Sequence, residues 1–314
     1  MDVWLSRFLI SATDGFLMLD ENLRVLNANE SWLQQAGLKY GEIIGRHIED
    51  IFPDMGKEKL ELYRKVMVTC DPVEFRHEDS TRLNGRVFDV KVFKIEEGIG
   101  VITREITEQA KYERGLEALH IHTSKIAEAK TLEEVCRLTY TLLQDALGFP
   151  VIDLIKIEDG YLIDVFSYGS EILQIPINGP GITARAARTG KTQFINDTRE
   201  DSDYIKGPRE WIALSELTVP VKIDGEPRLL INVESPEVNA FTENDRKLIE
   251  ILTRHLSSDI KRINYENTLE ALEKYSKLLH KASTLDEVVR TTLGFITDAM
   301  GYSRQVSELL KEKR

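Results

Sequence analysis

The chain has 314 residues, of which 42% are hydrophobic and 30% charged, and its formal net charge is −12. This length predicts two or three domains with cores of their own, and the acidic charge disfavours nonspecific nucleic-acid binding, which needs lysine and arginine to replace the counterions of phosphates. Because neither a long apolar run nor a signal-peptide pattern is found, we expect a cytoplasmic protein without nucleic-acid or membrane partners.

The first hundred residues alternate between strand and helix patterns. Residues 16–27 are two short apolar runs joined by Asp20-Glu21-Asn22, which predicts an antiparallel hairpin. The elements expected after it are a helix at 32–38, strands from residue 75, a tight turn at Asn84-Gly85 and a last strand at 100–103. This order predicts a small α+β domain built on one antiparallel sheet.

Residues 1–108 resemble a PAS domain. The stretches that carry the resemblance are Asp14-Gly15-Phe16, Asn27-Ala28-Asn29, residues 37–46, Ile51-Phe52-Pro53 and residues 104–108. The resemblance implies a sensor domain that holds a small ligand between its sheet and helices, or a domain that dimerises. Three aromatic residues are candidates to line such a cavity, although aromatic residues at these spacings more often form a plain core: Trp32, Tyr40 and Phe88.

The sequence does not identify a cofactor for this PAS-like domain. The flavin-binding subclass has a cysteine just after the position of Gly45-Arg46, where this chain has His47. Haem-binding members use a histidine on the helix that corresponds to residues 57–68, which contain none. His47 is an alternative axial ligand, but a lone histidine near a helix start is more often solvated or hydrogen-bonded.

A connector helix is expected at residues 109–130, and its apolar residues form a heptad seam. Residues 112–148 recur without a gap at residues 265–301, an offset of 153, which indicates an internal repeat. The seam residues and their equivalents are Tyr112/Tyr265, Leu116/Leu269, Leu119/Leu272, Thr123/Ser276 and Ile126/Leu279. The two seams predict parallel connectors that pair with another protomer in a homodimer; the alternative is that each seam packs onto its own domain. Two further residues of the first connector are expected at the surface: His120 and His122.

The middle of the chain predicts a second antiparallel sheet flanked by helices. The expected elements are strands at 151–157 and 161–167, a helix at 182–189 stopped by Gly190, strands at 217–223 and 229–234, and a helix at 243–263 capped by Thr242. Residues 264–314 are expected to form another connector helix and the truncated start of a second unit of the same kind.

Residues 112–263 resemble a GAF domain. The resemblance is carried by residues 179–190, Ile195-Asn-Asp197, Leu217-Thr-Val-Pro-Val221, residues 231–235 and residues 240–245. It implies a small ligand between the sheet and a covering loop at 169–211, and it places five polar residues where a ligand could meet them: Thr183, Arg185, Asn196, Asp197 and Glu216. Such residues are also suited to capping helices or to contact with water.

Catalytic chemistry is not expected. The bilin-attaching cysteine of phytochrome-type GAF domains has no counterpart, because Cys136 falls in the first helix, and the closely spaced cysteines of GAF-type methionine sulfoxide reductases are missing. No catalytic or metal-binding residue is predicted. We note, however, that residues remote in sequence could still meet in the fold.

The sequence therefore predicts an α+β protein with two antiparallel-sheet sensor domains, PAS-like and GAF-like, joined by amphipathic connector helices. We expect a signal-transduction protein that is not an enzyme, binds an unidentified small molecule, forms a homodimer and acts on a kinase or transcriptional-regulator partner. The alternatives are a ligand-free dimerisation scaffold and a GAF-type enzyme such as a reductase or phosphodiesterase.

Overall fold

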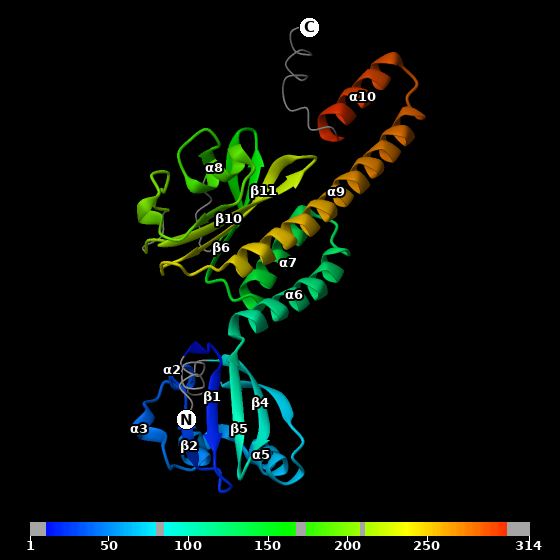
Figure 1. Ribbon diagram of the computed structural model, residues 1–314. Coiled ribbons are helices and arrows are strands. Elements are labelled where there is room, and N and C mark those ends of the chain that lie inside the picture. Colours follow the sequence, from blue (N-terminus) through cyan, green and yellow to red (C-terminus); the bar gives the residue numbers. More distant parts are fainter. Residues whose placement is uncertain (1–10, 80–84, 168–173, 208–210, 300–314) are drawn as a thin grey trace. The chain divides into compact units, whose positions relative to one another are not determined.

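The computed structural model describes residues 11–79, 85–167, 174–207 and 211–299. The chain divides into two compact units, Met1–Glu113 and Arg114–Arg314 (Figure 1). The mixed helical and antiparallel-sheet class expected from the sequence is confirmed. Three sequence predictions lie partly or wholly outside the described residues: the Asn84 side of the tight turn, parts of the covering loop at 169–211, and residues 300–314.

The first unit contains a five-stranded antiparallel sheet in the order β2-β1-β5-β4-β3. Its predicted N-terminal hairpin is confirmed, with Leu17 paired to Ala28. The Asp20 carboxylate stabilises the turn, because its Oδ1 accepts hydrogen bonds from the backbone N–H groups of Asn22 and Arg24, both at 2.8 Å. The strands are β1 (Gly15–Leu19), β2 (Val25–Ala28), β3 (Val73–Asp79), β4 (Arg86–Ile95) and β5 (Gly98–Glu105).

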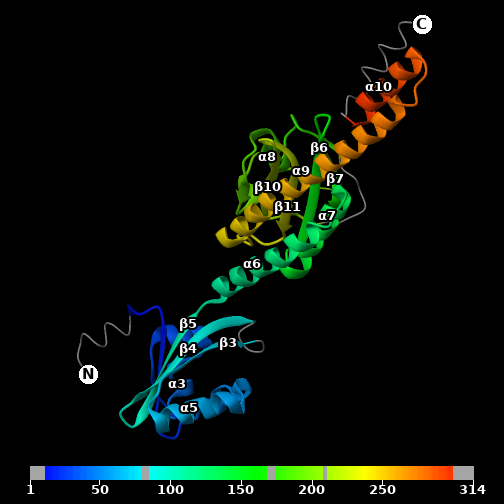
Figure 2. The same cartoon turned by 90° about the vertical axis from the view of Figure 1, so that its right-hand side faces the viewer.

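Helices bury the core of the first unit against this sheet. Asn29 fixes the start of α2, because its Oδ1 accepts from the backbone N–H of Trp32 at 2.9 Å and from that of Phe16 on β1 at 2.8 Å. The longest helix of this unit, α5, contacts β4 and β5 (Figure 2). The helices are α2 (Glu30–Ala36), α3 (Tyr40–Ile43), α4 (Ile48–Ile51) and α5 (Lys57–Thr69).

The second unit contains a six-stranded antiparallel sheet in the order β8-β7-β6-β11-β10-β9. The predicted strands are confirmed, and short edge strands complete the sheet. The strands are β6 (Val151–Glu158), β7 (Tyr161–Ser167), β8 (Gln174–Pro176), β9 (Gln193–Ile195), β10 (Ser215–Ile223) and β11 (Glu226–Ser235).

The two faces of this second sheet are covered differently (Figure 1). On one face lies α8 (Ile182–Thr189), whose buried alanines pack against Ile155 and Leu230. Because side chains alternate along a strand, Leu217, Val219 and Val221 point to the opposite face. That face is covered by α7 (Leu132–Thr141) and by α9 (Glu243–Leu279), which contacts β10.

The last helices differ from the expected arrangement. Thr242 caps α9 as predicted, and its Oγ1 accepts from the backbone N–H of Asp245 at 3.2 Å. However, α9 does not end near residue 263, because no glycine or proline interrupts residues 243–279. After α9, the chain turns into α10 (Leu285–Ala299), and the rings of Tyr275 and Phe295 stack with their centroids 4.6 Å apart.

The two heptad seams are in different environments. In α6 (Thr107–Ile126), Leu119 and Ile126 are only 2% and 0% exposed, and Thr123 Oγ1 lies 2.9 Å from Nδ1 of His255 on α9. The later part of the first seam therefore packs onto its own unit. Of the equivalents on α9, Leu272 is exposed by 43%, whereas Leu279 is half-buried. In the earlier part of each seam, Leu116 and its equivalent Leu269 are both exposed, by 37% and 47%.

His122 is also placed differently from the expectation. Its side chain is 6% exposed, so the predicted surface position is wrong, whereas His120 is exposed as expected. The reason is tertiary: Thr123 of α6 contacts His255 on α9, and the His122 side chain hydrogen-bonds to the backbone of Leu138 on α7. Among the described helices, none combines the length and the hydropathy needed to cross a bilayer.

Candidate functional site

A set of buried polar side chains lies on the face of the second sheet that α8 covers. The strands pair Glu216 with Glu234, Thr218 with Asn232, and Asn232 with Asp153. Because these positions alternate with apolar ones, all five side chains share one face. Their signal in the sequence is a polar residue at every second position of two apolar strands, β10 and β11.

These side chains are linked across the strands by hydrogen bonds. Thr218 Oγ1 is 2.7 Å from Asn232 Oδ1 and 3.1 Å from Glu216 Oε1, and Asn232 Nδ2 donates to Glu234 Oε1 at 3.2 Å. A hydroxyl group carries one proton, so Thr218 donates to only one of its two neighbours at a time. A proton on Glu216 would complete the chain, because Glu216 could then donate to Thr218 while Thr218 donates to Asn232.

The environment of Glu216 favours this protonated form. Burial raises the pKa of Glu216 to about 8, and the negative charges of Glu234, Asp153 and Asp201 act in the same direction. The hydrogen bond from Thr218 opposes the increase. The surroundings of Glu216 therefore favour its neutral form near pH 7. The five side chains on this face of the sheet, Asp153, Glu216, Thr218, Asn232 and Glu234, form its floor.

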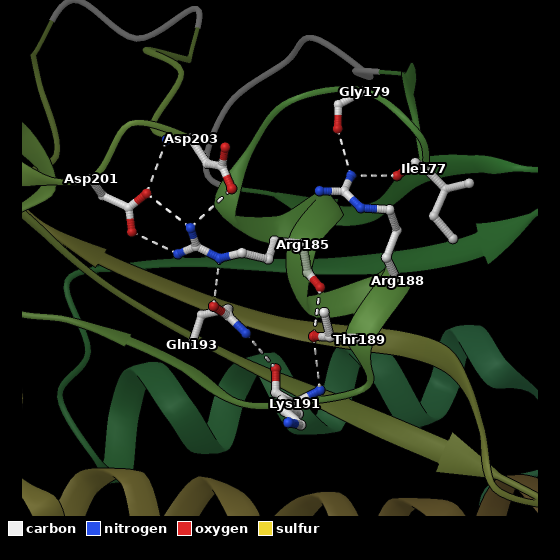
Figure 3. A network of polar contacts seen from close by, with 9 residues as sticks. All are labelled: Ile177, Gly179, Arg185, Arg188, Thr189, Lys191, Gln193, Asp201 and Asp203. Atoms are coloured by element: carbon white, nitrogen blue, oxygen red, sulfur yellow. Dashed lines mark hydrogen bonds and ion pairs between the residues drawn. The ribbon is translucent and has the colours of Figure 1, made fainter.

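Above this floor, Arg185 joins α8 to the loop that follows β9 (Figure 3). Its guanidinium donates from Nη1 and Nη2 to the two carboxylate oxygens of Asp201 at 3.0 and 2.6 Å, and from Nη1 to Asp203 Oδ2 at 2.9 Å. Nε donates to Gln193 Oε1 on β9 at 2.7 Å. The hydrogen bond from Arg185 lowers the pKa of Asp201, so this carboxylate stays charged and keeps the loop attached to α8.

A second arginine of α8 holds the preceding loop. Arg188 Nη1 donates to the backbone oxygens of Ile177 and Gly179 at 2.7 and 2.5 Å (Figure 3). The helix itself is limited by two glycines with positive φ, Gly181 at 125° and Gly190 at 62°, a region that side chains with a Cβ rarely adopt. Through its two arginines, α8 thus holds the loop before it and the loop after β9. The helix and these two loops form the cover of this face of the sheet.

An open pocket of about 420 Å³ lies beside this arginine network. Its lining residues are Arg185, Phe194, Ile195, Asn196, Asp197, Glu200, Asp201 and Ser202. The floor adjoins it, since Ile195 is the cross-strand partner of Glu216. The pocket can hold a small molecule, with mostly polar and acidic groups at its wall.

The five residues predicted in this unit are only partly gathered at the pocket. Arg185, Asn196 and Asp197 line it, whereas Thr183 and Glu216 do not. Asp197 also caps the short helix η3 (Thr198–Glu200) and pairs with Arg199, whose Nη2 is 2.5 Å from Asp197 Oδ2. Thr183 is half-buried on the first turn of α8, and a ligand contact for each of the five stays a prediction.

Sequence reasoning missed the residues that hold the cover and the floor. The partners of Arg185 come from separate segments, and the floor residues come from different strands, so no local spacing connects them. The missed residues are Asp153, Gln193, Asp201, Asp203, Thr218, Asn232 and Glu234. Among the described residues, no group of three or more His, Cys, Asp or Glu side chains is arranged to hold a metal ion.

The aromatic residues predicted to line a cavity in the first unit occupy different environments. Trp32 and Phe88 are 4% and 5% exposed and belong to the core, where Trp32 meets Phe52 edge-on with 6.0 Å between ring centroids. Tyr40 is 48% exposed, and its hydroxyl donates to Asn27 Oδ1 at 3.2 Å. A ligand-lining role for these three residues stays a prediction.

Two family models match the chain. Residues 9–111 match the PAS fold and residues 129–260 match the GAF domain. No curated protein matches the chain. The family matches thus place a PAS fold before a GAF domain along the sequence.

Several solved structures are similar to part of the chain. A free methionine-R-sulfoxide reductase from Neisseria meningitidis, in complex with its substrate, is 21% identical over 50% of this chain and 93% of its own, with a TM-score of 0.46. The GAF domain of a phosphoenolpyruvate-protein phosphotransferase from Coxiella burnetii is 20% identical over 49% and 97%, with a TM-score of 0.46. Residues 122 to 287 of a methyl-accepting chemotaxis protein are 21% identical over 48% and 99%, with a TM-score of 0.41.

Proposed function

This chain carries a PAS fold followed by a GAF domain, and we propose that it is a signalling sensor whose GAF domain binds a small polar ligand and passes the bound state to a protein partner. The ligand would lie between the second sheet and the cover formed by α8 and the loop after β9. The partner would be a kinase or a transcriptional regulator.

The buried polar floor is the observation that carries this proposal. Polar side chains in a core lower stability unless each is satisfied, and an apolar face would serve a structural sheet equally well. Here Glu216, Thr218 and Asn232 are 4%, 0% and 2% exposed on the same face as the pocket. Because oxygen acceptors dominate the floor and the pocket wall, the expected ligand is a small molecule with several hydrogen-bond donors.

The relay would use α9. This helix contacts β10 of the ligand-binding sheet and continues without interruption to its contact with α10. A ligand that favours one packing of β10 against α9 would change the position of the seam residues farther along the helix. Couplings of this kind are typically about 1–3 kcal/mol, which changes a partner's equilibrium by about fivefold or more.

An enzymatic role at the same face of the second sheet has less support than ligand binding. A thiol-based reductase would need a cysteine there, but the chain has only two cysteines. Cys70 is exposed in the first unit, and Cys136 is buried on α7, where burial raises the pKa of its thiol to about 12. We therefore propose a binding function without catalysis.

Native mass spectrometry with an absorption spectrum tests the proposal on the purified full chain. We expect a colourless protein that retains a small ligand as a mass increment. Asn232→Leu removes the central amide of the floor and should lose the ligand, whereas Asn264→Leu, at an exposed position of α9, should retain it. A ligand-free wild type would support the scaffold alternative, and equal ligand retention by both variants would place the site elsewhere.

A further inference from the structure

Two buried side-chain atoms in the helical layer of the second unit have no hydrogen-bond partner. They are Nε2 of His122 on α6 and Oγ1 of Thr139 on α7, and the two residues are 6% and 0% exposed. Among the described residues, no other buried side-chain nitrogen or oxygen atom lacks a hydrogen-bond partner. Such groups weaken the contact in which they are buried.

The internal repeat relates these two residues to a pair of side chains that meet in the second copy. At the offset of 153, His122 corresponds to Tyr275 on α9, and Thr139 corresponds to Thr292 on α10. In that second pair, the Tyr275 hydroxyl lies 2.9 Å from Thr292 Oγ1, within hydrogen-bonding distance. The equivalent side chains are thus within hydrogen-bonding distance in the second copy, whereas His122 Nε2 and Thr139 Oγ1 have no partner in the first.

The surroundings of His122 oppose its protonation. Burial lowers the pKa of His122, and the nearby charges of Lys125 and His255 lower it further, against the effect of a hydrogen bond with the backbone of Leu138. Lys125 on α6 and His255 on α9 are the groups that act on His122 through their charge. Asp259 and Arg262 follow His255 along α9, and Glu133, Glu134, Cys136 and Arg137 lie on the first two turns of α7.

Two of these neighbours already have partners. Arg262 Nη2 donates to the backbone oxygens of Ile126 and Ala129 at 3.3 and 3.1 Å, so its charge holds the end of α6. The Asp259 side chain is 3.9 Å from the Arg262 guanidinium. Neither contact gives a proton on His122 Nε2 an acceptor.

We propose that His122 is a proton-sensitive latch: its neutral form holds α6 against α7, and its protonation loosens this contact. A charged imidazole at this position would be buried without an acceptor for Nε2, so the opened state binds the proton more readily. Because the pKa of folded His122 lies below the ordinary value of 6.5, the contact weakens as the pH falls below about 6.5.

The latch would add a second input to the sensor. α6 is the helix through which the chain passes from the first unit into the second. Acidification would therefore act on this helix without any ligand at the sheet. The inference does not depend on the proposed ligand pocket, because it concerns the opposite face of the second sheet.

Hydrogen exchange of the full chain between pH 7.5 and 5.5, corrected for intrinsic exchange, tests the latch. Peptides from α6 and α7 should show an opening equilibrium constant that rises by up to about tenfold per pH unit below about 6.5. His122→Tyr, which copies the second repeat, should remove this increase. His120→Tyr, at an exposed position of the same helix, should leave it unchanged.

A second variant keeps the test decisive if His122→Tyr does not fold. Thr139→Val removes the other unpartnered group, so it should lower the opening equilibrium constant at every pH. The dependence of this constant on pH should stay the same as in the wild type. An opening constant of the wild type that does not change with pH, or a slope retained by His122→Tyr, would overturn the proposal.

Discussion

At Glu216, a carboxyl group is buried on an apolar strand and surrounded by other acids. Burial raises its proton affinity most, and the acids on β11, on β6 and on the loop after β9 raise it further, while the hydrogen bond with Thr218 on its own strand lowers it. The same principle acts in the opposite direction at Asp201, where the Arg185 guanidinium lowers the pKa of the carboxyl group. Two acids on one face thus hold different charges near neutral pH.

The raised pKa of Glu216 predicts a pH dependence of stability. The folded state keeps its proton to about pH 8, while an unfolded glutamate loses it near 4.5, so stability should fall as the pH rises through this window. The slope would be at most about 1.4 kcal/mol per pH unit. Glu216→Gln, which mimics the neutral acid, should remove this part of the dependence and be more stable than wild type at pH 8.

Thermal unfolding of the second unit between pH 5 and 8 measures this difference. Glu226→Gln changes an exposed glutamate of β11 and serves as the control, so its profile should follow that of the wild type. Parallel profiles for the wild type and Glu216→Gln would show that the Glu216 side chain is already ionised in the folded protein.

At the scale of single elements, α8 shows how a short helix can organise a site. It has eight residues, too few for a stable isolated helix, so its position depends on buried alanines and on the contacts of its arginines. Arg185 holds the loop after β9, and Arg188 holds the loop before α8. Each of the two arginines therefore fixes one of the two loops that cover the sheet together with α8.

Loss of the Arg185 side chain should free the loop after β9. Arg185→Met keeps most of the apolar stem but leaves Asp201 and Asp203 without their ion pairs, at a cost of about 1–3 kcal/mol in local stability. Hydrogen exchange should increase in residues 198–207. Arg188→Met is the matched control on the same helix, and it should affect residues 174–180 instead; equal effects of both variants on residues 198–207 would contradict the assignment.

For the whole molecule, the unequal seams determine which surface is available to another protomer. The later part of the first seam is covered by α9 of the same chain, whereas Tyr265, Leu269 and Leu272 are 67%, 47% and 43% exposed. A second copy of α9, running parallel, would bury this stripe. The proposed homodimer would therefore use the α9 seam instead of both seams.

Replacing two residues of the exposed stripe should abolish this dimer. Leu269→Glu combined with Leu272→Glu places charges in the seam, and light scattering after size-exclusion chromatography should show a monomer. Val68→Glu, at an exposed position of α5, should leave the dimer intact. A wild-type monomer at micromolar concentration would refute pairing through α9, as would a dimer that survives the double substitution.

Local patterns in the sequence predicted most of the elements of both sheets and their order, but not the edge strands β8 and β9 or the full length of α9. Turn residues and alternating apolar positions predicted the hairpin at 16–27 and the strands of the second sheet. Gly190 and Thr242 marked the end of α8 and the start of α9. The repeat at 112–148 and 265–301 was also visible, because each of these signals lies within a short segment.

Only the tertiary structure decided which residues are buried and which meet. Glu216, Asn232 and Asp153 come together because β10, β11 and β6 are adjacent, an order that no local spacing reveals. The same limit explains why a buried His122 was expected at the surface. A heptad pattern marks an apolar stripe, but whether that stripe is covered depends on distant segments of the chain, and those contacts arise only from the packing of the whole unit.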